Sequence, residues 1–258
     1  MKFIKHIGIL SAMPEEIGST LDNLMDVKKF TFGDLNIYQG YWVDHINKKN
    51  ILLTTAWSGW GKVSAARAAT RLLGLKGDYI PIETLIFTGV AGALNNDLNQ
   101  WDIIVPNKVC QYDMDARPIF DKFIIPSLNK KYLDTDSLLQ KWAFDSIKKY
   151  LDDNNSSKFG KIYDGIIGTA DKFISNEKSR NSIIKEFPRM QAVEMEGAAV
   201  AQVAYQEEIP WILIRVISDC ADKTAVQNFN DFLDDYSKFS WNLIEVILKN
   251  ISSIKFKN

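Results

Sequence analysis

The sequence predicts an α/β fold in which a single domain, residues 1–258, is built on a central mixed β-sheet flanked by helices. Short, uninterrupted apolar runs bounded by Gly, Asn and Pro recur along the chain, as expected for strands buried on both faces of a sheet. Between them lie segments whose apolar residues repeat at three- and four-residue spacing, as in amphipathic helices. Strands that alternate with helices are typical of α/β sheets.

Each expected element follows from one of these patterns. Strands are expected at residues 7–10, 51–55, 85–87, 103–105, 162 and 211–217. Helices are expected at residues 63–73, 138–151, 197–201 and 232–251. Residues 36–43 alternate between two faces, which predicts an early antiparallel meander and therefore a mixed sheet. The polar residues 152–158 are expected to form a surface loop.

The composition restricts the kind of ligand. With 31 Lys and Arg against 32 Asp and Glu, the net charge of -1 provides no global positive field for nucleic acid or an anionic membrane. Two histidines and two cysteines make a zinc ribbon impossible, and we expect no metal and no cofactor. A small neutral or zwitterionic ligand fits best. Acid-base chemistry then falls mainly to carboxylates.

The cysteines and the apolar runs predict the compartment. Cys110 and Cys220 lie far apart and show no framework spacing, so we expect reduced thiols in a cytoplasmic protein. The apolar run after the basic start covers only residues 7–10, which is short for a signal peptide. No run approaches the ~20 apolar residues that cross a bilayer, so a soluble protein is expected.

Acidic residues follow two of the buried strands, at the positions where open α/β sheets bind ligands. Glu15 and Glu16 follow the first strand at the start of a helix. They could instead only complement the helix dipole. Ser218 and Asp219 follow the most apolar strand, where Asp219 could equally cap a helix.

Two glycine-rich segments could bring backbone close to a ligand. Ser-Gly-Trp-Gly-Lys at residues 58–62 opens the helix expected at 63–73, and Thr-Gly-Val-Ala-Gly-Ala at 88–93 follows the strand at 85–87. Tight turns are the simpler interpretation of both segments. Neither matches the P-loop pattern or the Gly-x-Gly-x-x-Gly dinucleotide pattern.

A third acidic segment, Val-Glu-Met-Glu, precedes a helix of small residues. Glu194 and Glu196 could be solvated, but the Gly and Ala residues beside them predict close helix packing. Such packing would bury one of the two carboxylates and require a partner for it.

The order of these motifs is more specific than any one of them. Along the chain, from Ile7 to about Phe232, the motifs are Gly-Ile-Leu-Ser-Ala-Met-Pro-Glu-Glu, Ser-Gly-Trp-Gly-Lys-Val, Thr-Gly-Val-Ala-Gly-Ala-Leu, Asp-Ile-Ile-Val, Ala-Val-Glu-Met-Glu-Gly-Ala-Ala and Ile-Ser-Asp-Cys-Ala-Asp. This succession resembles the methylthioadenosine/S-adenosylhomocysteine nucleosidases of the purine nucleoside phosphorylase superfamily. The resemblance implies a nucleoside phosphorylase-like fold. It also implies hydrolysis of the N-glycosidic bond of 5′-methylthioadenosine and/or S-adenosylhomocysteine, which releases adenine and a thioribose sugar.

The resemblance implies a role for each acidic residue. Glu16 would activate the attacking water, and Asp219 would protonate the purine at N7. Cleavage of this bond develops positive charge on the ribose and negative charge on the purine, so one acid and one base are required. We expect Asp219 to hold or share a proton, while Glu16 and Glu196 stay ionised.

The resemblance also implies the binding residues. Met195 and Glu196 would contact the ribose, Phe173 would stack on the base, the backbone at Ile174 would read the edge of the base, and Phe229 would close over the sugar. The full binding set is Ala12, Met13, Trp60, Val90, Ala91, Gly92, Phe173, Ile174, Glu194, Met195, Glu196, Ser218 and Phe229.

The sequence departs from the family pattern in several places. Val90 stands where many relatives have serine, Ala93 replaces a glycine, and Trp60 replaces a medium aliphatic residue near the 5′-alkylthio group. Residues 113–126 also diverge. In the family this segment reaches the neighbouring subunit's pocket, so a homodimer is expected. Because the segment diverges here, the preference for the 5′ substituent is the family property that carries over least to this chain.

Three other functions remain open. A purine nucleoside phosphorylase would need cationic groups for phosphate where this chain has Glu15 and Glu16. A nucleosidase could instead act on another purine nucleoside, such as adenosine. A non-catalytic nucleoside-binding protein would have no need for an acid and a base on opposite sides of one bond.

Overall fold

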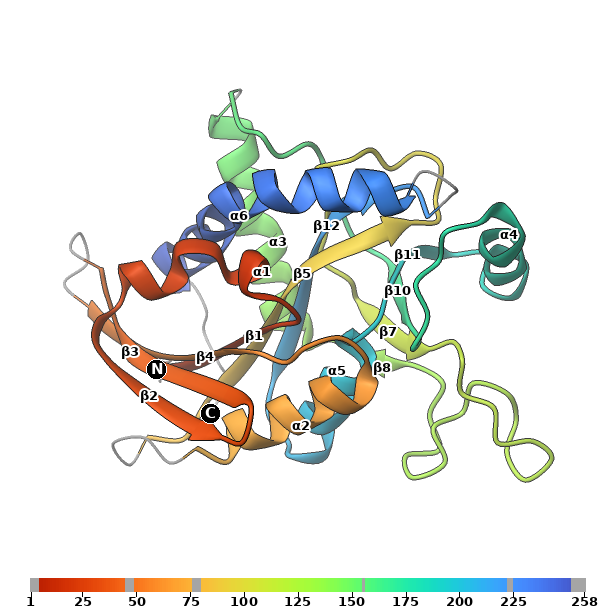
Figure 1. Ribbon diagram of the computed structural model, residues 1–258, viewed down its shortest axis with the longest axis horizontal. Helices are drawn as coiled ribbons and strands as arrows, with labels where there is room; N and C mark the ends of the chain where they lie inside the picture. The colour runs from red at the N-terminus through yellow and green to blue at the C-terminus, as the bar shows by residue number, and fades with distance from the viewer. Residues whose placement is uncertain (1–4, 45–48, 76–79, 155, 222–224, 252–258) are drawn as a thin grey trace.

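A computed structural model describes residues 5–44, 49–75, 80–154, 156–221 and 225–251 (Figure 1). Its strands are β1 (His6–Ser11), β2 (Met25–Phe32), β3 (Leu35–Asp44), β4 (Lys49–Trp57), β5 (Thr84–Ala93), β6 (Ile103–Ile104), β7 (Lys108–Gln111), β8 (Leu133–Asp134), β9 (Ile162–Tyr163), β10 (Ile166–Thr169), β11 (Met190–Glu194) and β12 (Trp211–Asp219). Its helices are α1 (Pro14–Ile17), the 3-10 helix η1 (Gly18–Asn23), α2 (Lys62–Leu73), α3 (Ser137–Asp153), α4 (Glu177–Glu186), α5 (Gly197–Gln206) and α6 (Ala225–Lys249).

The described strands form one mixed sheet around β5. Strand β5 pairs in parallel with β1 on one side and β12 on the other, and its end pairs antiparallel with β11. β2, β3 and β4 form the antiparallel meander predicted from residues 36–43, and β4 joins β1 in parallel. β6 pairs antiparallel with β12, while β7, β10 and β11 run parallel to one another. The prediction of a mixed sheet is confirmed.

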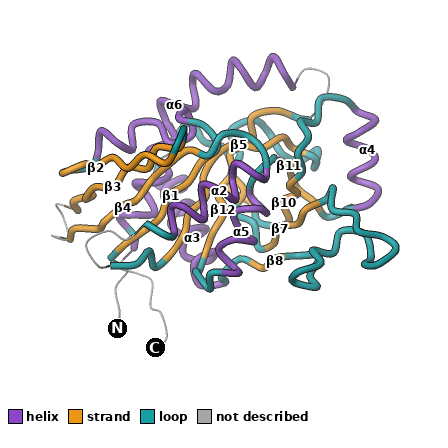
Figure 2. The backbone as a smooth tube through the Cα atoms, turned by 60° about the horizontal axis from the view of Figure 1, so that its bottom comes forward, coloured by secondary structure: helices purple, strands orange, loops and turns teal. Residues whose placement is uncertain are grey.

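Helices cover both faces of the sheet, as Figures 1 and 2 show. Strand residues alternate between the two faces, so Leu85 and Phe87 pack in the core beneath α2 and α5, whereas Ile86 packs in the core beneath α3 and α6. Small residues such as Ala68 and Ala201 let α2 and α5 approach closely. The α/β fold with a sheet flanked by helices is therefore confirmed.

One prediction about the sheet is wrong. The segment 88–93 is not a turn after a strand at 85–87, because β5 continues through it to Ala93. Its neighbours explain why, since β12 pairs with it as far as Gly92 and β11 pairs with both Gly92 and Ala93. Partners on both sides hold the glycines extended, whereas the segment taken alone is typical of a turn.

The sequence patterns missed short elements and placed some ends inaccurately. β2, β7, β10, β11 and α4 are either too short or too polar to give a clear periodicity. The helix expected at 138–151 extends to Asp153, so the surface loop is shorter than residues 152–158, and residue 155 lies outside the described residues. Neither Cys110 nor Cys220 is in a disulfide in the part of the chain that the structure describes. Within the described ranges, no helix has the length and apolar character needed to span a membrane.

Candidate active site

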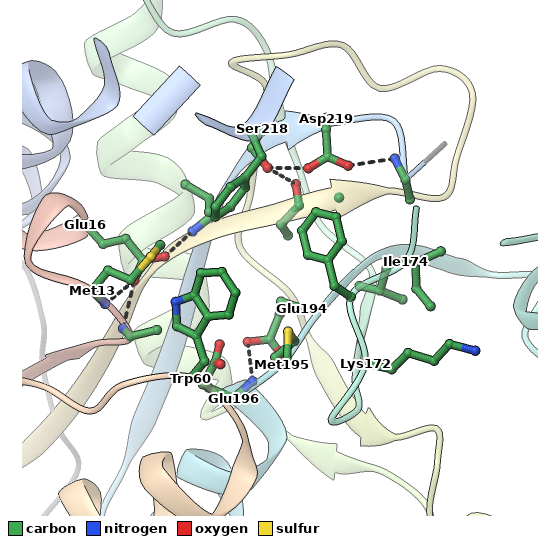
Figure 3. Close-up of a pocket in the computed structure, with 18 residues that line it drawn as sticks. Met13, Glu16, Trp60, Lys172, Ile174, Glu194, Met195, Glu196, Ser218 and Asp219 are labelled. Carbon is green, nitrogen blue, oxygen red and sulfur yellow. Dashed lines mark hydrogen bonds between the residues drawn. The ribbon is translucent and has the colours of Figure 1, made fainter. Parts of the chain in front are cut away.

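A cavity lies at the carboxyl ends of β1, β5 and β12, beside the starts of α1 and α5 (Figure 3). All fifteen site residues predicted from the sequence line it. Three lining residues were not predicted: Lys172, Val193 and Ala221. The last acid of the Ser-Asp-Cys-Ala-Asp motif, Asp222, lies outside the described residues. The sequence thus pointed to residues of one cavity that the fold assembles from seven separate segments.

Glu16 is buried in the first turn of α1, and its carboxylate is held by backbone donors. Oε2 accepts the N–H groups of Ala12 at 2.7 Å and Met13 at 3.0 Å, while Oε1 accepts that of Val90 at 2.9 Å. Burial raises the pKa of Glu16, and the charge of Arg215 together with the N–H donors opposes that shift. The three donors fix the carboxylate in place and favour its ionised form.

Asp219 ends β12, on another part of the cavity wall (Figure 3). Its Oδ2 accepts the hydroxyl of Ser218 at 2.7 Å, and its Oδ1 accepts the N–H of Ala221 at 2.8 Å. The side chain is buried, with 4% of the residue exposed. Asp219 and Glu16 therefore present fixed carboxyl groups to one cavity from different secondary-structure elements.

Two glycines of β5 make room for these carboxyl groups. A Cβ at Gly89 would lie 2.3 Å from Oε1 of Glu16, and one at Gly92 would lie 3.0 Å from Oδ1 of Asp219. The first distance is far below van der Waals contact, so Gly89 is required for Glu16 to sit where it does. The glycine-rich segment thus lets two carboxyl groups approach the strand, a reason for its glycines that a turn would not supply.

The two glutamates of the Val-Glu-Met-Glu motif have different surroundings. Glu194 is fully paired: Oε2 accepts the N–H of Gly197 at 2.7 Å and the Arg215 guanidinium at 2.8 Å, and Oε1 accepts the Thr169 hydroxyl. Glu196 Oε1 accepts a hydrogen bond of 2.7 Å from the N–H of Gly61. Close packing was predicted to bury one of these two acids, and the structure buries both and gives each a partner.

The surroundings of Glu196 affect its charge. Burial and the neighbouring Glu194 carboxylate raise the pKa of Glu196 to about 8, so its protonated form dominates at neutral pH in the nucleoside-free protein. This differs from the expectation that Glu196 is ionised. The cause is tertiary, because the strand end and the helix start place the two carboxyl groups side by side away from water.

Arg215 is the residue of this site that sequence reasoning missed. It is 1% exposed within β12, bonds Glu194, and lies 4.1 Å from the centre of the Phe87 ring. Its Nη1 would be 3.1 Å from a Cβ at Gly89, the same position that Oε1 of Glu16 approaches. The available signal was a lone arginine inside an otherwise apolar strand, since such a charge needs a buried partner.

Aromatic side chains form the opposite wall of the cavity. The Phe229 ring contacts Trp60 edge to face at 6.0 Å and Phe173 at 5.7 Å. Trp60 is 53% exposed, which is unusual for so large an apolar residue. The wall is therefore apolar, it is open to solvent at Trp60, and each of its rings has a face on which a planar ligand can stack.

The cavity offers little to a metal or to phosphate. Among the described residues, no group of three or more His, Cys, Asp or Glu side chains is placed to hold a metal ion. The cation among the lining residues is Lys172, whose side chain points away from the carboxyl groups (Figure 3). The guanidinium of Arg215 is already paired with Glu194.

Comparisons with known proteins agree with this arrangement. The family model of the phosphorylase superfamily matches residues 6–249. The 5′-methylthioadenosine/S-adenosylhomocysteine nucleosidase of Staphylococcus haemolyticus is 32% identical over 245 residues, which cover 94% of this chain and 99% of the relative. The chain belongs to this nucleosidase family of the phosphorylase superfamily. It is therefore an enzyme.

Solved structures of this family and of a neighbouring one share the fold. The nucleosidase of Neisseria meningitidis, in complex with methylthio-immucillin-A, matches with a TM-score of 0.83 and 28% identity over 95% of this chain and 99% of that chain. Futalosine hydrolase of Helicobacter pylori matches with a TM-score of 0.80 and 28% identity, over 95% and 97%. Members of this nucleosidase family thus share their architecture with an enzyme named for a different substrate.

Proposed function

We propose that this enzyme hydrolyses the N-glycosidic bond of adenine nucleosides, with 5′-methylthioadenosine and S-adenosylhomocysteine as the candidate substrates. The observation that carries the proposal is the placement of Glu16 and Asp219. Two fixed, buried carboxyl groups face one apolar cavity from different elements, as the cleavage of a glycosidic bond by a base and an acid requires.

The reaction assigns one role to each carboxyl group. Glu16 takes a proton from water while the water oxygen attacks C1′ of the ribose. As the bond from C1′ to N9 breaks, its electron pair passes to the purine, and Asp219 delivers a proton to N7. Ser218 and the N–H of Ala221 hold Asp219 for this transfer. Without Glu16 the attacking water keeps its proton and becomes positively charged, and without Asp219 the leaving purine carries an unneutralised negative charge.

Glu196 and the aromatic wall act on the sugar and the base. Glu196, with Met195, contacts the ribose. The positive charge that develops there favours ionised Glu196, so the pKa raised by burial falls as the reaction proceeds. An ionised carboxylate then stabilises the oxocarbenium-like state more than the ground state. Phe173 stacks on the base, and the backbone at Ile174 binds its edge.

Water is favoured over phosphate as the nucleophile. A phosphate dianion needs cationic donors, whereas the buried groups nearest the expected ribose are Glu16 and Glu196, and the guanidinium of Arg215 is engaged by Glu194. Phosphate would meet the Glu16 carboxylate, and no unpaired cation among these groups, in a site of low dielectric constant.

Futalosine is the second candidate substrate. The match to Helicobacter pylori futalosine hydrolase is at the same 28% identity as the match to the Neisseria meningitidis nucleosidase. Overall similarity therefore does not separate the two substrates. The aromatic wall bears on the choice, because Trp60 stands where a 5′ substituent is expected.

A homodimer is part of the proposal. Val63 and Ile119 are 82% and 83% exposed, and Trp60 is half-exposed. These apolar side chains belong to the start of α2, to residues 113–126 and to the open edge of the cavity. A partner subunit that covers them, with its own residues 113–126 near this pocket, would remove apolar surface from water. Two cysteines outside any disulfide, Cys110 and Cys220, are consistent with a cytoplasmic enzyme.

A substrate panel tests the proposal. Methylthioadenosine, S-adenosylhomocysteine, adenosine, inosine and futalosine are incubated with the enzyme, with and without phosphate, and the free base and the sugar are measured. We expect adenine and the unphosphorylated sugar as the products in both buffers. A sugar 1-phosphate as main product would assign a phosphorylase, and inosine as the best substrate would exclude an adenine nucleosidase.

A further inference from the structure

We propose that Lys62, Asp113 and Asp171 form a clamp that sets the positions of the aromatic walls of the pocket. None of the three lines the cavity. They would therefore be positioning residues, which affect the affinity for the nucleoside through Trp60 and Phe173. The inference rests on the proposed function for the identity of the ligand.

The first side of the clamp fixes the turn that carries Trp60. The N–H of Gly61 donates to Glu196 Oε1, and the next N–H, that of Lys62, donates to Asp171 Oδ1, both at 2.7 Å. Gly61 has φ +89, and a Cβ there would lie 3.0 Å from Oδ1 of Asp171. Carboxylates from two other segments thus hold two consecutive N–H groups. Glycine is needed at position 61 because the Asp171 carboxylate lies so close to it.

The second side connects both segments to Asp113. Oδ1 of Asp113 accepts Nζ of Lys62 at 2.7 Å, and Oδ2 accepts the N–H of Asp171 at 3.1 Å. Nζ of Lys62 also donates to Gln111 at 3.3 Å, and Gln111 in turn bonds Gln202 of α5 at 2.8 Å. One carboxylate therefore joins the start of α2 to the segment that carries the base-stacking ring.

Two of the clamp residues, Lys62 and Asp171, stand two positions from the rings. Trp60 precedes Lys62 by two residues, Phe173 follows Asp171 by two residues, and both rings contact Phe229. Trp60 is too exposed for packing alone to fix its place. The hydrogen bonds of the clamp supply the constraint that packing lacks, because they join the two segments that carry Trp60 and Phe173.

The charges of the clamp add little to folding stability. The side chains of Lys62 and Asp113 are 18% and 32% exposed, and ion pairs near water contribute little to stability. Their effect should appear in ligand binding instead, because rings that are already ordered lose less freedom when the nucleoside binds.

Steady-state kinetics with methylthioadenosine separate this role from a structural one. Asp171→Ala removes the acceptor of the Lys62 N–H, and we expect KM to rise about ten-fold while kcat changes by less than about three-fold. Asp171→Asn keeps an acceptor oxygen and should restore most of the affinity. The matched control is Asp145→Ala, which removes the 2.8 Å pair with Lys141 on α3, far along the chain from the pocket segments.

A double-mutant cycle provides a second measurement. Lys62→Met keeps the aliphatic stem but loses the charge, and Asp113→Ala loses both of its bonds. If the clamp acts as a unit, the fold-increase in KM of the double variant is smaller than the product of the fold-increases of the two single variants. Purely multiplicative effects, or a KM for Asp171→Ala equal to that of the wild type, would overturn the proposal.

Binding of adenine distinguishes the clamp from the proposed function. Its Kd, measured by calorimetry, should rise in Asp171→Ala and stay unchanged in Asp145→Ala. If the wild type cleaves no adenine nucleoside but this pattern in Kd holds, the proposed reaction fails and the clamp stands. If the wild type is active and Kd is the same in all variants, the clamp fails and the reaction stands.

Discussion

The floor and the rim of the pocket are held by different forces. The floor, made of Glu16, Glu194, Arg215 and Asp219, is buried, and each of its charged groups has hydrogen-bond partners in the sheet or at a helix start. The rim, made of Trp60, Phe173 and Phe229, is held by edge-to-face ring contacts and is partly exposed. A buried charge without partners is costly, whereas a partly exposed ring depends on its ring contacts and on the hydrogen bonds of the segment that carries it.

This difference assigns two kinds of function. Groups that cannot move suit the chemical step, which needs charges at fixed distances. Rings at the open edge of the cavity suit recognition of the nucleoside, whose 5′ substituent varies among the candidate substrates. Changes in the floor should therefore alter turnover or stability, and changes in the rim should alter the choice of substrate.

The largest expected effect is on turnover, from the two carboxyl groups. Glu16→Gln and Asp219→Asn should each lower kcat by ~10²–10⁴, because a general base or a general acid is lost while the shape is kept. Both variants are assayed for adenine release, and a thermal melt verifies folding. Near wild-type kcat in a folded variant would remove that residue from the mechanism.

The next effect is on stability, from the ion pair of the floor. Arg215→Met leaves the Glu194 carboxylate buried without its cation, which should lower the free energy of unfolding by ~3–5 kcal/mol. The double variant Arg215→Met/Glu194→Gln removes both charges and should regain part of this loss. Urea denaturation measures the free energy of unfolding of both variants. An Arg215→Met protein as stable as the wild type would show that the floor does not depend on this pair.

The pH dependence of stability tests Glu196, which lies between floor and rim. Its folded pKa of about 8 is above the unfolded value of 4.5, so between these values the folded state holds a proton that the unfolded state has lost. The contribution of Glu196 to stability should therefore be fully present below pH 4.5 and be lost as the pH rises towards 8, by up to ~1.4 kcal/mol per pH unit.

The variant Glu196→Gln isolates this effect, because the amide oxygen still accepts the Gly61 N–H but cannot ionise. Melting temperatures of wild type and variant, measured from pH 5 to pH 8, should diverge as the pH rises, with the wild type losing more. Parallel curves would mean that Glu196 is ionised throughout, as in an open, hydrated site.

The smallest expected effect concerns the rim. Trp60 should narrow the 5′ pocket, so the wild type accepts methylthioadenosine but handles the longer homocysteine tail poorly. Trp60→Ile should then shift the ratio of the two kcat/KM values about ten-fold, the equivalent of ~1–2 kcal/mol of apolar contact. Trp57→Phe, on β4, is the control. Wild-type preference for the homocysteine substrate, or an unchanged ratio in Trp60→Ile, would show that Trp60 only packs.

The sequence by itself determined the fold class and the membership of the site. Apolar runs and helical spacing predict the sheet and its main helices, because burial alone dictates those patterns. The family resemblance carried by the order of the motifs pointed to fifteen of the residues that line the cavity, and the acids Glu16 and Asp219 among them follow strand ends, where this class of fold binds ligands. The roles assigned to Glu16 and Asp219 remain predictions.

Only the tertiary structure decided how those residues are held. Residues 88–93 have the sequence of a turn, but pairing with β11 and β12 makes them part of a strand. In that strand Gly89 leaves space for the Glu16 carboxylate. Arg215 and the raised pKa of Glu196 depend on neighbours from distant segments. A local pattern records whether a residue is buried, but it carries no information about which charge lies beside it, because that is fixed only when strands distant in sequence become neighbours.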